Sequence, residues 1–459
     1  MYDQWLERAR RRGAKYADLR VQRLETNGLE LRNGKIERVV EGHEDGLGIH
    51  VLVDGAWGFA ATNDLRVEAI GRVLERALSL ARATSKRSKQ KSGVAPEKSY
   101  EASVLWKPKV APANVDPSEK EAVVKTMHEA VRSYKEVKST TGSYADRTLG
   151  QEFLSTEGAH VTTSVTRTVA QVHFIAKAGP RITSRRVRVG ATKGFEVFRD
   201  VDVAKKAREG AAATVRLLKA PASPSGRLTV VLDPELTGVF SHEALGHASE
   251  GDLVAAGESC LKGRIGDKLG SEIVTLCDDS TVPGGFGSFP YDDQGMPGRR
   301  RVLLEKGVVV GHLNDRVSAF KLQMHSTGSA RAESYADRPL VRMTNTFIEA
   351  GDHSFDELLE GIKEGVYAVG SRGGQVDTAK GSFQFNAQES YLIKNGEIAH
   401  PLRDVSLTGF TLETLANIDA LGKEFHWGDP GYCGKGQYVP VGDGGPHTRV
   451  KECVVGGSA

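Results

Sequence analysis

The sequence predicts an α+β protein with an N-terminal α/β region, a central α+β region and a large β-rich C-terminal domain. Capped amphipathic stretches alternate with runs of alternating polar and apolar residues, which indicate helices and half-buried strands. X-Gly pairs typical of hairpin turns recur along the chain: Asn33-Gly34, Asp54-Gly55, Lys306-Gly307 and Asn395-Gly396. At 459 residues the chain is too long for one ordinary core, so several domains are expected.

The first region, residues 1–84, is expected to form an α+β domain. A helix at the start, an alternating stretch at 18–24 and a hairpin at 49–59 precede a second helix. That helix presents Ile70 and Leu74 on one face, as a helix covering a sheet does.

Residues 85–115 are predicted to be a linker, because a basic, serine-rich run is followed there by several prolines. The central α+β domain, residues 116–222, begins with Asp116 as a helix cap and Pro117 at the first helical position. Alternating segments around 165–174 predict strands in this domain.

The C-terminal domain, residues 226–459, begins with a strand. Asp233 then caps a helix, so a helix is expected near the start of this domain. A capping box at Ser354 and Glu357 predicts a further helix that continues through Ile362.

The composition is that of a globular protein, with 39% hydrophobic and 26% charged residues. Because 62 basic residues nearly balance 59 acidic ones, charge gives no reason to expect nucleic acid or a membrane as partner. The N-terminus lacks the apolar run of a signal peptide, and no stretch is long enough for a membrane span. No CxxC pair or disulfide framework appears among the cysteines, which indicates a cytoplasmic protein: Cys260, Cys277, Cys433 and Cys453.

The helix near the start of the C-terminal domain carries the motif His242-Glu243-Ala-Leu-Gly246-His247. A hydrolytic zinc site needs imidazole ligands, an open position for water and a carboxylate beside that water. In the common zinc-protease motif the two histidines are four residues apart, about 40° around a helix. Here the spacing is five residues, which an ideal α-helix would place about 140° apart.

Two conformations would bring these histidines together. A π-bulge adds one residue to the turn, or the helix ends at Gly246 and the backbone turns His247 inward. Both hypotheses make Gly246 the residue that permits the geometry, and they predict that Gly246→Val strongly reduces metal occupancy.

A third ligand is required, and five residues are candidates: Cys433, Cys453, Glu250, Asp252 and His426. Cys433 lies in a glycine-rich loop that could bring a thiolate to a metal. Cys453 lies in an alternating strand, where a buried packing thiol is the ordinary case. Glu250 and Asp252 fit better as groups that orient the histidine ligands.

Several ordered motifs, in addition to residues 242–252, resemble the TldD/PmbA (TldE) metallopeptidase family, on the TldD side. They are Gly266–Ser271, Asp278-Asp279, Tyr291–Gly295, Glu333–Tyr335, Arg342–Thr346, Gly374–Asp377, Arg403–Ser406, Cys433–Gln437 and Val439–Gly442. The resemblance implies zinc held by His242, His247 and Cys433, with Glu243 as general base.

The resemblance also implies unfolded peptide substrates, a link to modulation of DNA gyrase inhibition, and a dimer. The dimer partner would be a TldE/PmbA-like paralogue without the zinc motif, or a second copy of this chain. The sequence departs from the family pattern at 328–335 and at Asp292–Gly295, and the loop that begins at Cys433 is one residue shorter. The first two departures bear on substrate contacts, and the third on the course of the loop.

The function expected is therefore zinc-dependent hydrolysis of peptide bonds in unfolded or extended peptides. One alternative is a peptide-binding, gyrase-modulating module with a structural zinc, and another is a zinc amidase acting on a small substrate. Glu243 argues against the structural alternative, because a structural site has no use for a base beside its ligand.

Overall fold

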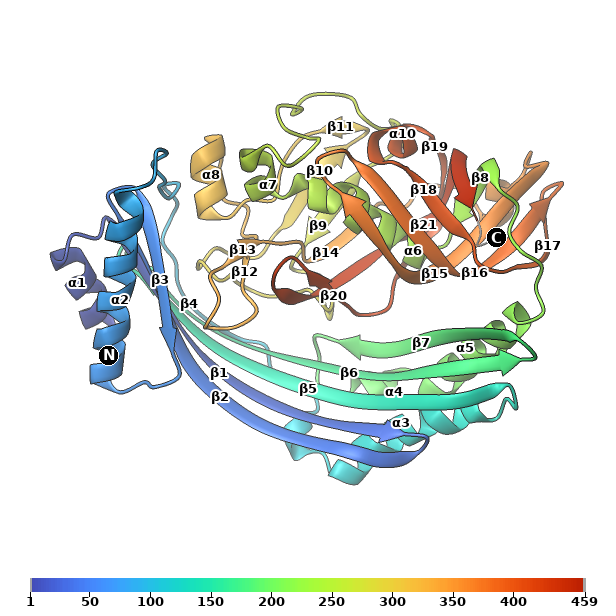
Figure 1. The fold of residues 1–459 in the computed structure, drawn as a ribbon, viewed down its shortest axis with the longest axis horizontal. Helices are drawn as coiled ribbons and strands as arrows, with labels where there is room; N and C mark the ends of the chain where they lie inside the picture. Colours follow the sequence, from blue (N-terminus) through green and yellow to red (C-terminus); the bar gives the residue numbers. More distant parts are fainter. Residues whose placement is uncertain (1, 457–459) are drawn as a thin grey trace.

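The computed structural model describes residues 2–456, which form two large sheets with helices on their surfaces (Figure 1). This mixed architecture with a strand-rich C-terminal part confirms the predicted α+β class. Among the described residues, no helix has the length and apolar character that crossing a membrane requires.

The first sheet contains seven strands from the N-terminal half of the chain. They are β1 (Tyr16–Arg32), β2 (Lys35–Val53), β3 (Ala56–Thr62), β4 (Glu101–Leu105), β5 (Val137–Ser155), β6 (His160–Ala178) and β7 (Arg181–Ala191). Their order is β3-β2-β1-β5-β6, and both β4 and β7 pair with the far side of β6. Because β1 pairs with β5 from Asp18 to Arg32, the N-terminal and central regions share one continuous sheet.

The segment predicted as a linker is not wholly irregular. Within it, β4 pairs in parallel with residues 160–164 of β6, and Pro112–Asn114 form a short 3-10 helix. The strand was missed because its partner lies about 60 residues further along the chain, and no local pattern reveals such a pairing.

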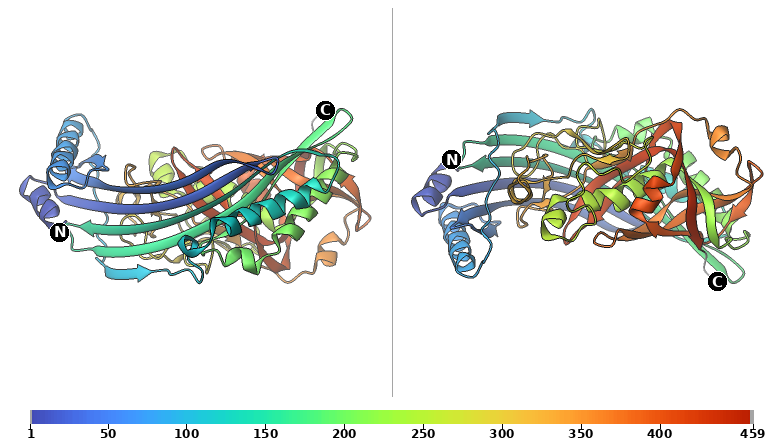
Figure 2. Two further views of the ribbon diagram at one scale, coloured as in Figure 1. Left: turned by 90° about the horizontal axis from the view of Figure 1, so that it is seen from below. Right: turned by 90° about the horizontal axis from the view of Figure 1, so that it is seen from above.

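Helices pack against this sheet in two groups. Helices α1 (Asp3–Arg11) and α2 (Val67–Ser85) pack at one end, where Trp5 and Leu74 join a core with Leu19 and Ile49. Helices α3 (Pro117–Arg132) and α5 (Val203–Leu217) lie side by side across the outer face at the other end, close to the short α4 (Val197–Asp200) (Figure 2). As predicted, Asp116 caps α3 by accepting a hydrogen bond from the backbone N–H of Ser118.

The second sheet contains twelve strands and lies on the concave side of the first (Figure 1). They are β8 (Gly226–Leu232), β9 (Leu276–Asp279), β10 (Arg300–Glu305), β11 (Val308–Val309), β14 (Asn345–Ile348), β15 (Glu364–Asp377), β16 (Ser382–Lys394), β17 (Glu397–Leu402), β18 (Ser406–Phe410), β19 (Ile418–Trp427), β20 (Gly431–Gly434) and β21 (Tyr438–Gly456). Since β8 pairs with both β15 and β21, the strands β21, β18, β16, β15 and β8 close into a ring. A separate two-stranded pair joins β12 (Ala330–Arg331) to β13 (Leu340–Val341).

The remaining helices are short. They are α6 (Pro234–Phe240), a π-helix (Ser241–Gly246), a 3-10 turn (His247–Ser249), α7 (Gly251–Ala256), α8 (Arg316–Leu322), α9 (Phe355–Leu359) and α10 (Thr411–Ala416). The helix α6 and the π-helix pack against β15 and β21, with Phe240 against Phe383 and Phe385. The wall of the ring therefore fixes the start of the histidine motif.

The local turn and capping signals gave correct predictions. All four X-Gly pairs have positive φ at both residues, as their hairpins require. The capping box of Ser354 and Glu357 is present, but α9 ends at Leu359 and does not continue through Ile362. The helix stops because Glu360 has an extended backbone, with ψ of 137°.

Candidate metal centre

A π-helix brings the two histidines of the motif to one side. Asp233 caps α6 at the backbone N–H of Leu236, and the chain then widens into the π-helix Ser241–Gly246. A π turn contains about one more residue than an α turn, so residues five apart meet. The rings of His242 and His247 lie 5.2 Å apart at an interplanar angle of 90°. The π-bulge hypothesis is confirmed.

The alternative, in which the helix ends at Gly246, is wrong. Gly246 has helical φ and ψ of −56° and −55°, and the chain continues into a 3-10 turn at His247. Any residue can adopt this backbone, so glycine is not needed for conformational freedom. A Cβ atom at this position would lie 2.2 Å from Sδ of Met343, so this buried side chain would have to shift to admit any other residue.

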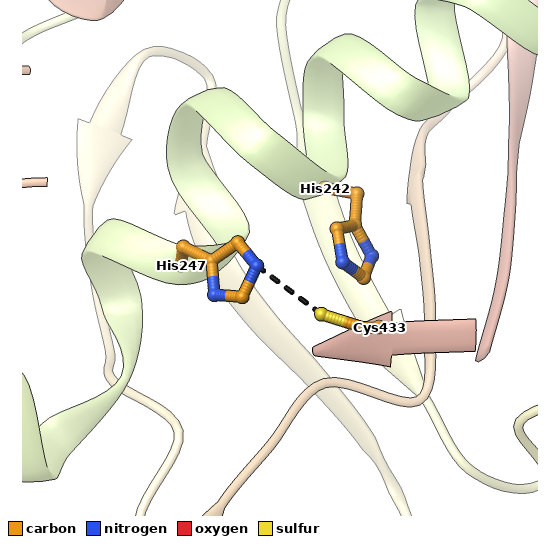
Figure 3. Close-up of side chains that lie close together, drawn as sticks. All are labelled: His242, His247 and Cys433. Atoms are coloured by element: carbon orange, nitrogen blue, oxygen red, sulfur yellow. Dashed lines mark hydrogen bonds between the residues drawn. The ribbon is translucent and has the colours of Figure 1, made fainter. Parts of the chain in front are cut away.

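Cys433 completes a group of three donors. Its Sγ lies 3.2 Å from Nε2 of His247, and the ligand atoms of Cys433, His242 and His247 all lie within 4.8 Å of one another (Figure 3). All three residues are buried. Cys433 reaches this position on β20, which forms a hairpin with β21 by pairing with Val439, so the shortened loop is a tight turn.

The other candidates for a third ligand do not join this group, which is the only one of its kind among residues 2–456. Cys453 is a packing residue of the core, opposite Leu228 of β8. His426 is exposed on β19.

Glu250 and Asp252 contact the centre in different ways. Oε2 of Glu250 accepts a hydrogen bond from Nδ1 of His247 at 3.1 Å and is fully buried. This contact leaves Nε2 of His247 facing the sulfur, as expected for a residue that orients a ligand. Asp252 binds the Nζ atom of Lys435 at 2.7 and 2.8 Å, so its connection to the centre runs through the turn that follows Cys433.

The electrostatics of the three donors favour a thiolate. Burial raises the pKa of Cys433, but charge and hydrogen bonding from His242 and His247 outweigh burial and lower that pKa to about 4. Burial lowers the pKa of His247, whereas the charge of Glu250 raises it well above its ordinary value. The two rings thus favour a buried negative sulfur, which a metal cation would also stabilise.

These residues fit a zinc ion. Two imidazoles and one thiolate are a donor set that zinc accepts, and three protein ligands leave one position open, as in catalytic sites. Glu243 lies beside the group, with Oε2 at 3.9 Å from Nε2 of His247, and its side chain is 23% exposed. The carboxylate is therefore the member of the motif that faces solvent.

The centre faces a cleft of about 590 Å³ between the two sheets. His242, Glu243 and Cys433 line one wall. Other lining residues come from the edge strand β7 and from β15, with Ser184, Arg185, Arg186, Arg188, Ser371, Arg372, Gly373 and Gly374. The central region and the C-terminal domain therefore both contribute residues to the cleft.

Carboxyl groups also line this cleft. Burial and the charge of Asp429 raise the pKa of Glu235 to about 8. Burial also raises the pKa of Asp443 to about 7, against the opposing effect of His242. Acidic groups and arginines therefore both line the cleft.

Some residues of the site carry no recognisable signal in the sequence. Arg342 and Lys435 lie in motifs that the family resemblance includes, but nothing in their spacing assigns them a contact. Glu235 follows the capping residue Asp233 and has no chemical motif around it, and neither do the arginines of β7. The departure at Gln294 is buried, and its side chain accepts a hydrogen bond from the backbone N–H of Arg316.

Comparison with known proteins agrees with this geometry. Residues 17–81, 111–218 and 225–457 match domain 1, the central domain and the C-terminal domain of the PmbA/TldA metallopeptidases. A metalloprotease of Methanothermobacter thermautotrophicus is 44% identical over 96% of both chains. A zinc metalloprotease TldD homologue of Saccharolobus solfataricus is 31% identical over 99% of both chains.

The crystal structure of TldE from Thermococcus kodakarensis has the same fold, with a TM-score of 0.80 at 20% identity over 99% of both chains. At this identity the likeness establishes the fold alone, whereas the three domain matches cover most of the chain. The chain therefore belongs to the PmbA/TldD metallopeptidase family.

Proposed function

We propose that this protein is a zinc-dependent peptidase that cleaves unfolded or extended polypeptides, with zinc held by His242, His247 and Cys433. The observation that carries the proposal is the convergence of these donors beside Glu243 at the wall of the cleft. When bound, zinc supplies a Lewis acid that polarises the scissile carbonyl and lowers the pKa of water.

Glu243 acts as the general base. Its carboxylate lines the cleft and lies close to the Nε2 atom that faces the metal position. It takes a proton from the attacking water and delivers that proton to the leaving amine. Glu250 keeps His247 in the required orientation through its hydrogen bond to Nδ1.

The free edge of β7 supports extended substrates. The backbone N–H of Arg188 points away from β6 and donates to Asp429 at 3.1 Å. Residues two apart on a strand direct their backbone groups to the same side, so Ser184 and Arg186 present theirs toward the cleft. An extended peptide can pair with such an edge through its own backbone, which a folded chain cannot do.

Two further parts of the proposal concern the setting of the enzyme. We propose a cytoplasmic protein without a membrane or nucleic-acid partner, in keeping with its balanced charge and reduced cysteines. We also propose that it acts as a dimer, either with a second copy or with a TldE/PmbA-like paralogue. Light scattering of the purified chain distinguishes a homodimer from a monomer that needs another partner.

The alternative is a peptide-binding, gyrase-modulating module with a structural zinc. A structural site has four protein ligands, and the residues described by the structure offer a group of three beside a carboxylate. Three protein ligands would leave one coordination position of the zinc open, which favours a catalytic site over a structural one.

The test compares wild type, Glu243→Gln and the exposed control Glu424→Gln on a denatured protein and on its native form. We expect Glu243→Gln to retain zinc and lose about 10²- to 10⁴-fold in the rate on the denatured form. Glu424→Gln should match wild type, and the native form should resist cleavage. Full activity of Glu243→Gln would refute the role of base, and equal rates on both forms would refute the substrate class. Zinc without turnover of any unfolded peptide would favour the binding module.

A further inference from the structure

The turn that carries Cys433 is held by a single buried arginine. Arg342 follows β13, is 0% exposed and has the largest side chain among the fully buried residues described. Its Nη2 donates to the carbonyl of Cys433 at 2.6 Å, and its Nη1 donates to the carbonyl of Gln437 at 2.8 Å. One guanidinium thus binds both ends of the turn between β20 and β21.

The same arginine faces the partner of a histidine ligand. Its Nε lies 3.8 Å from Oε1 of Glu250, and the other oxygen of this carboxylate binds Nδ1 of His247. Neither Nε of Arg342 nor Oε1 of Glu250 has another hydrogen-bond partner in the structure. Arg342 is therefore a common neighbour of the thiolate turn and of the group that orients the histidine.

Lys435 makes a second connection from the tip of the turn. Its Nζ lies 3.1 Å from Oε2 of Glu250, binds both oxygens of Asp252, and donates to the carbonyl of Val341 at 3.2 Å. The glycines on either side, Gly434 and Gly436, would leave the turn mobile without such contacts. The lysine thus ties the turn to the segment that follows His247.

The charges of this network balance, but burying them costs free energy. Arg342 and Lys435 supply two positive charges against the carboxylates of Glu250 and Asp252. Burying charged groups usually stabilises a fold no better than apolar packing of the same volume. A role in stability alone therefore gives little reason for such a network, whereas its contacts converge on two of the three donors.

We propose that Arg342 and Lys435 are positioning residues that hold the sulfur of Cys433 at the correct distance from the histidine nitrogens before a metal binds. This inference rests on the proposed zinc site and deepens it. The turn is held in place by the protein, so the metal does not have to order a flexible loop when it binds.

The test measures metal binding directly. Cobalt(II) replaces zinc, and its thiolate charge-transfer band reports the Cys433 contact, while competition with a chelator gives the metal affinity. Arg342→Lys keeps the charge but loses the rigid fork that binds two carbonyls. We expect its metal affinity to fall about 10- to 100-fold, as found for residues behind metal ligands, with a weaker charge-transfer band.

Two further comparisons separate positioning from general stability. Arg301 is also buried and binds Asp278 and the carbonyls of Thr327 and Gly328, so Arg301→Lys is a matched control that should leave the cobalt spectrum unchanged. Lys435→Met should weaken metal binding and Lys435→Arg should restore most of it. Because the Lys435 side chain is 19% exposed, these variants keep the test valid if Arg342→Lys does not fold.

Wild-type affinity and an unchanged spectrum in both Arg342→Lys and Lys435→Met would overturn the inference. An equal loss in Arg301→Lys would also overturn it, because the effect would then follow stability. Suppose that wild type binds cobalt through a thiolate and that only Arg342→Lys and Lys435→Met lose this binding. The inference then stands even when no peptide is cleaved. Failure of wild type to bind zinc or cobalt would instead refute the proposed zinc site and this inference together.

Discussion

The sulfur of Cys433 lies 3.2 Å from Nε2 of His247, although 186 residues separate them in the chain. Cys433 comes from a β-hairpin, His242 from a π-helix and His247 from the 3-10 turn that follows it. The candidate metal centre is thus an assembly of two distant segments.

Replacement of Cys433 by serine should remove the metal. A hydroxyl is a much poorer zinc ligand than a thiolate, so we expect zinc to fall from about one per chain to a small fraction. Elemental analysis of the purified protein measures this directly. Cys453→Ser is the matched control, because both cysteines are 7% exposed but only Cys433 lies in the centre. Equal zinc in the two variants would exclude Cys433 as a ligand.

Gly246→Ala should disturb the π-helix between the histidines. The added Cβ would meet Met343, and overpacking of this kind costs about 1–3 kcal/mol. We expect lower stability in denaturation and reduced metal occupancy, and Gly246→Val should be worse. The double variant with Met343→Ala should recover metal binding, because it opens the space. No recovery would mean that the close contact with Met343 is not the reason for the glycine.

Asp18 should make stability depend on pH. Burial raises its pKa to about 7 in the folded protein, against about 3.9 in an unfolded chain. The folded state then holds the proton more tightly, so this contribution is complete below about pH 4 and is lost as the pH rises toward 7. The slope from this one group is about −1.4 kcal/mol per pH unit within that window.

Asp18→Asn removes this titration. We therefore expect the denaturation midpoint of wild type to fall relative to that of the variant as the pH rises from 5 to 7. Burial lowers the pKa of His50, which lies 3.8 Å from Asp18, to about 3, so His50 adds a contribution to stability that rises with pH up to about 6.5. This contribution is present in both proteins, so the difference between their slopes reports Asp18. Identical slopes in the two proteins would show that Asp18 is ionised in the folded state throughout.

The arginines that line the cleft should favour acidic peptides. Arg186 is exposed and lines the cleft, so Arg186→Ala is expected to raise KM for acidic peptides up to about fivefold, with little change in kcat. Added salt should weaken the wild-type preference in the same direction. Arg38→Ala, which removes an exposed arginine on β2, serves as the control. Equal KM values for acidic and neutral peptides in wild type would contradict the prediction.

Local chemistry made much of this molecule predictable from sequence. Asn33-Gly34 and the capping box at Ser354 depend on neighbouring residues, and the structure contains them as expected. The five-residue spacing of His242 and His247 predicted a π-bulge as one of two conformations, because helix geometry allows few ways to bring such residues together.

Pairings between distant segments were not predictable in the same way. The pairing of β1 with β5 joins residues more than 100 positions apart. The alternation of polar and apolar residues indicates a strand but does not identify its partner. Arg342 was missed for a related reason, since a fully buried arginine looks like a surface residue until its partners are known. The need for glycine at position 246 depends on Met343, which is also remote in sequence.

The ring that holds the histidine helix closes only when β21 pairs with β8. The hairpin that carries Cys433 joins β20 to the first residues of the same strand β21. During synthesis, the histidines therefore emerge long before their third partner, with 186 further residues still to be translated after His247. A nascent chain is extended and unfolded, which is the kind of polypeptide that this cleft is proposed to accept. The order of segments thus allows the three donors to meet only after most of the chain has been synthesised.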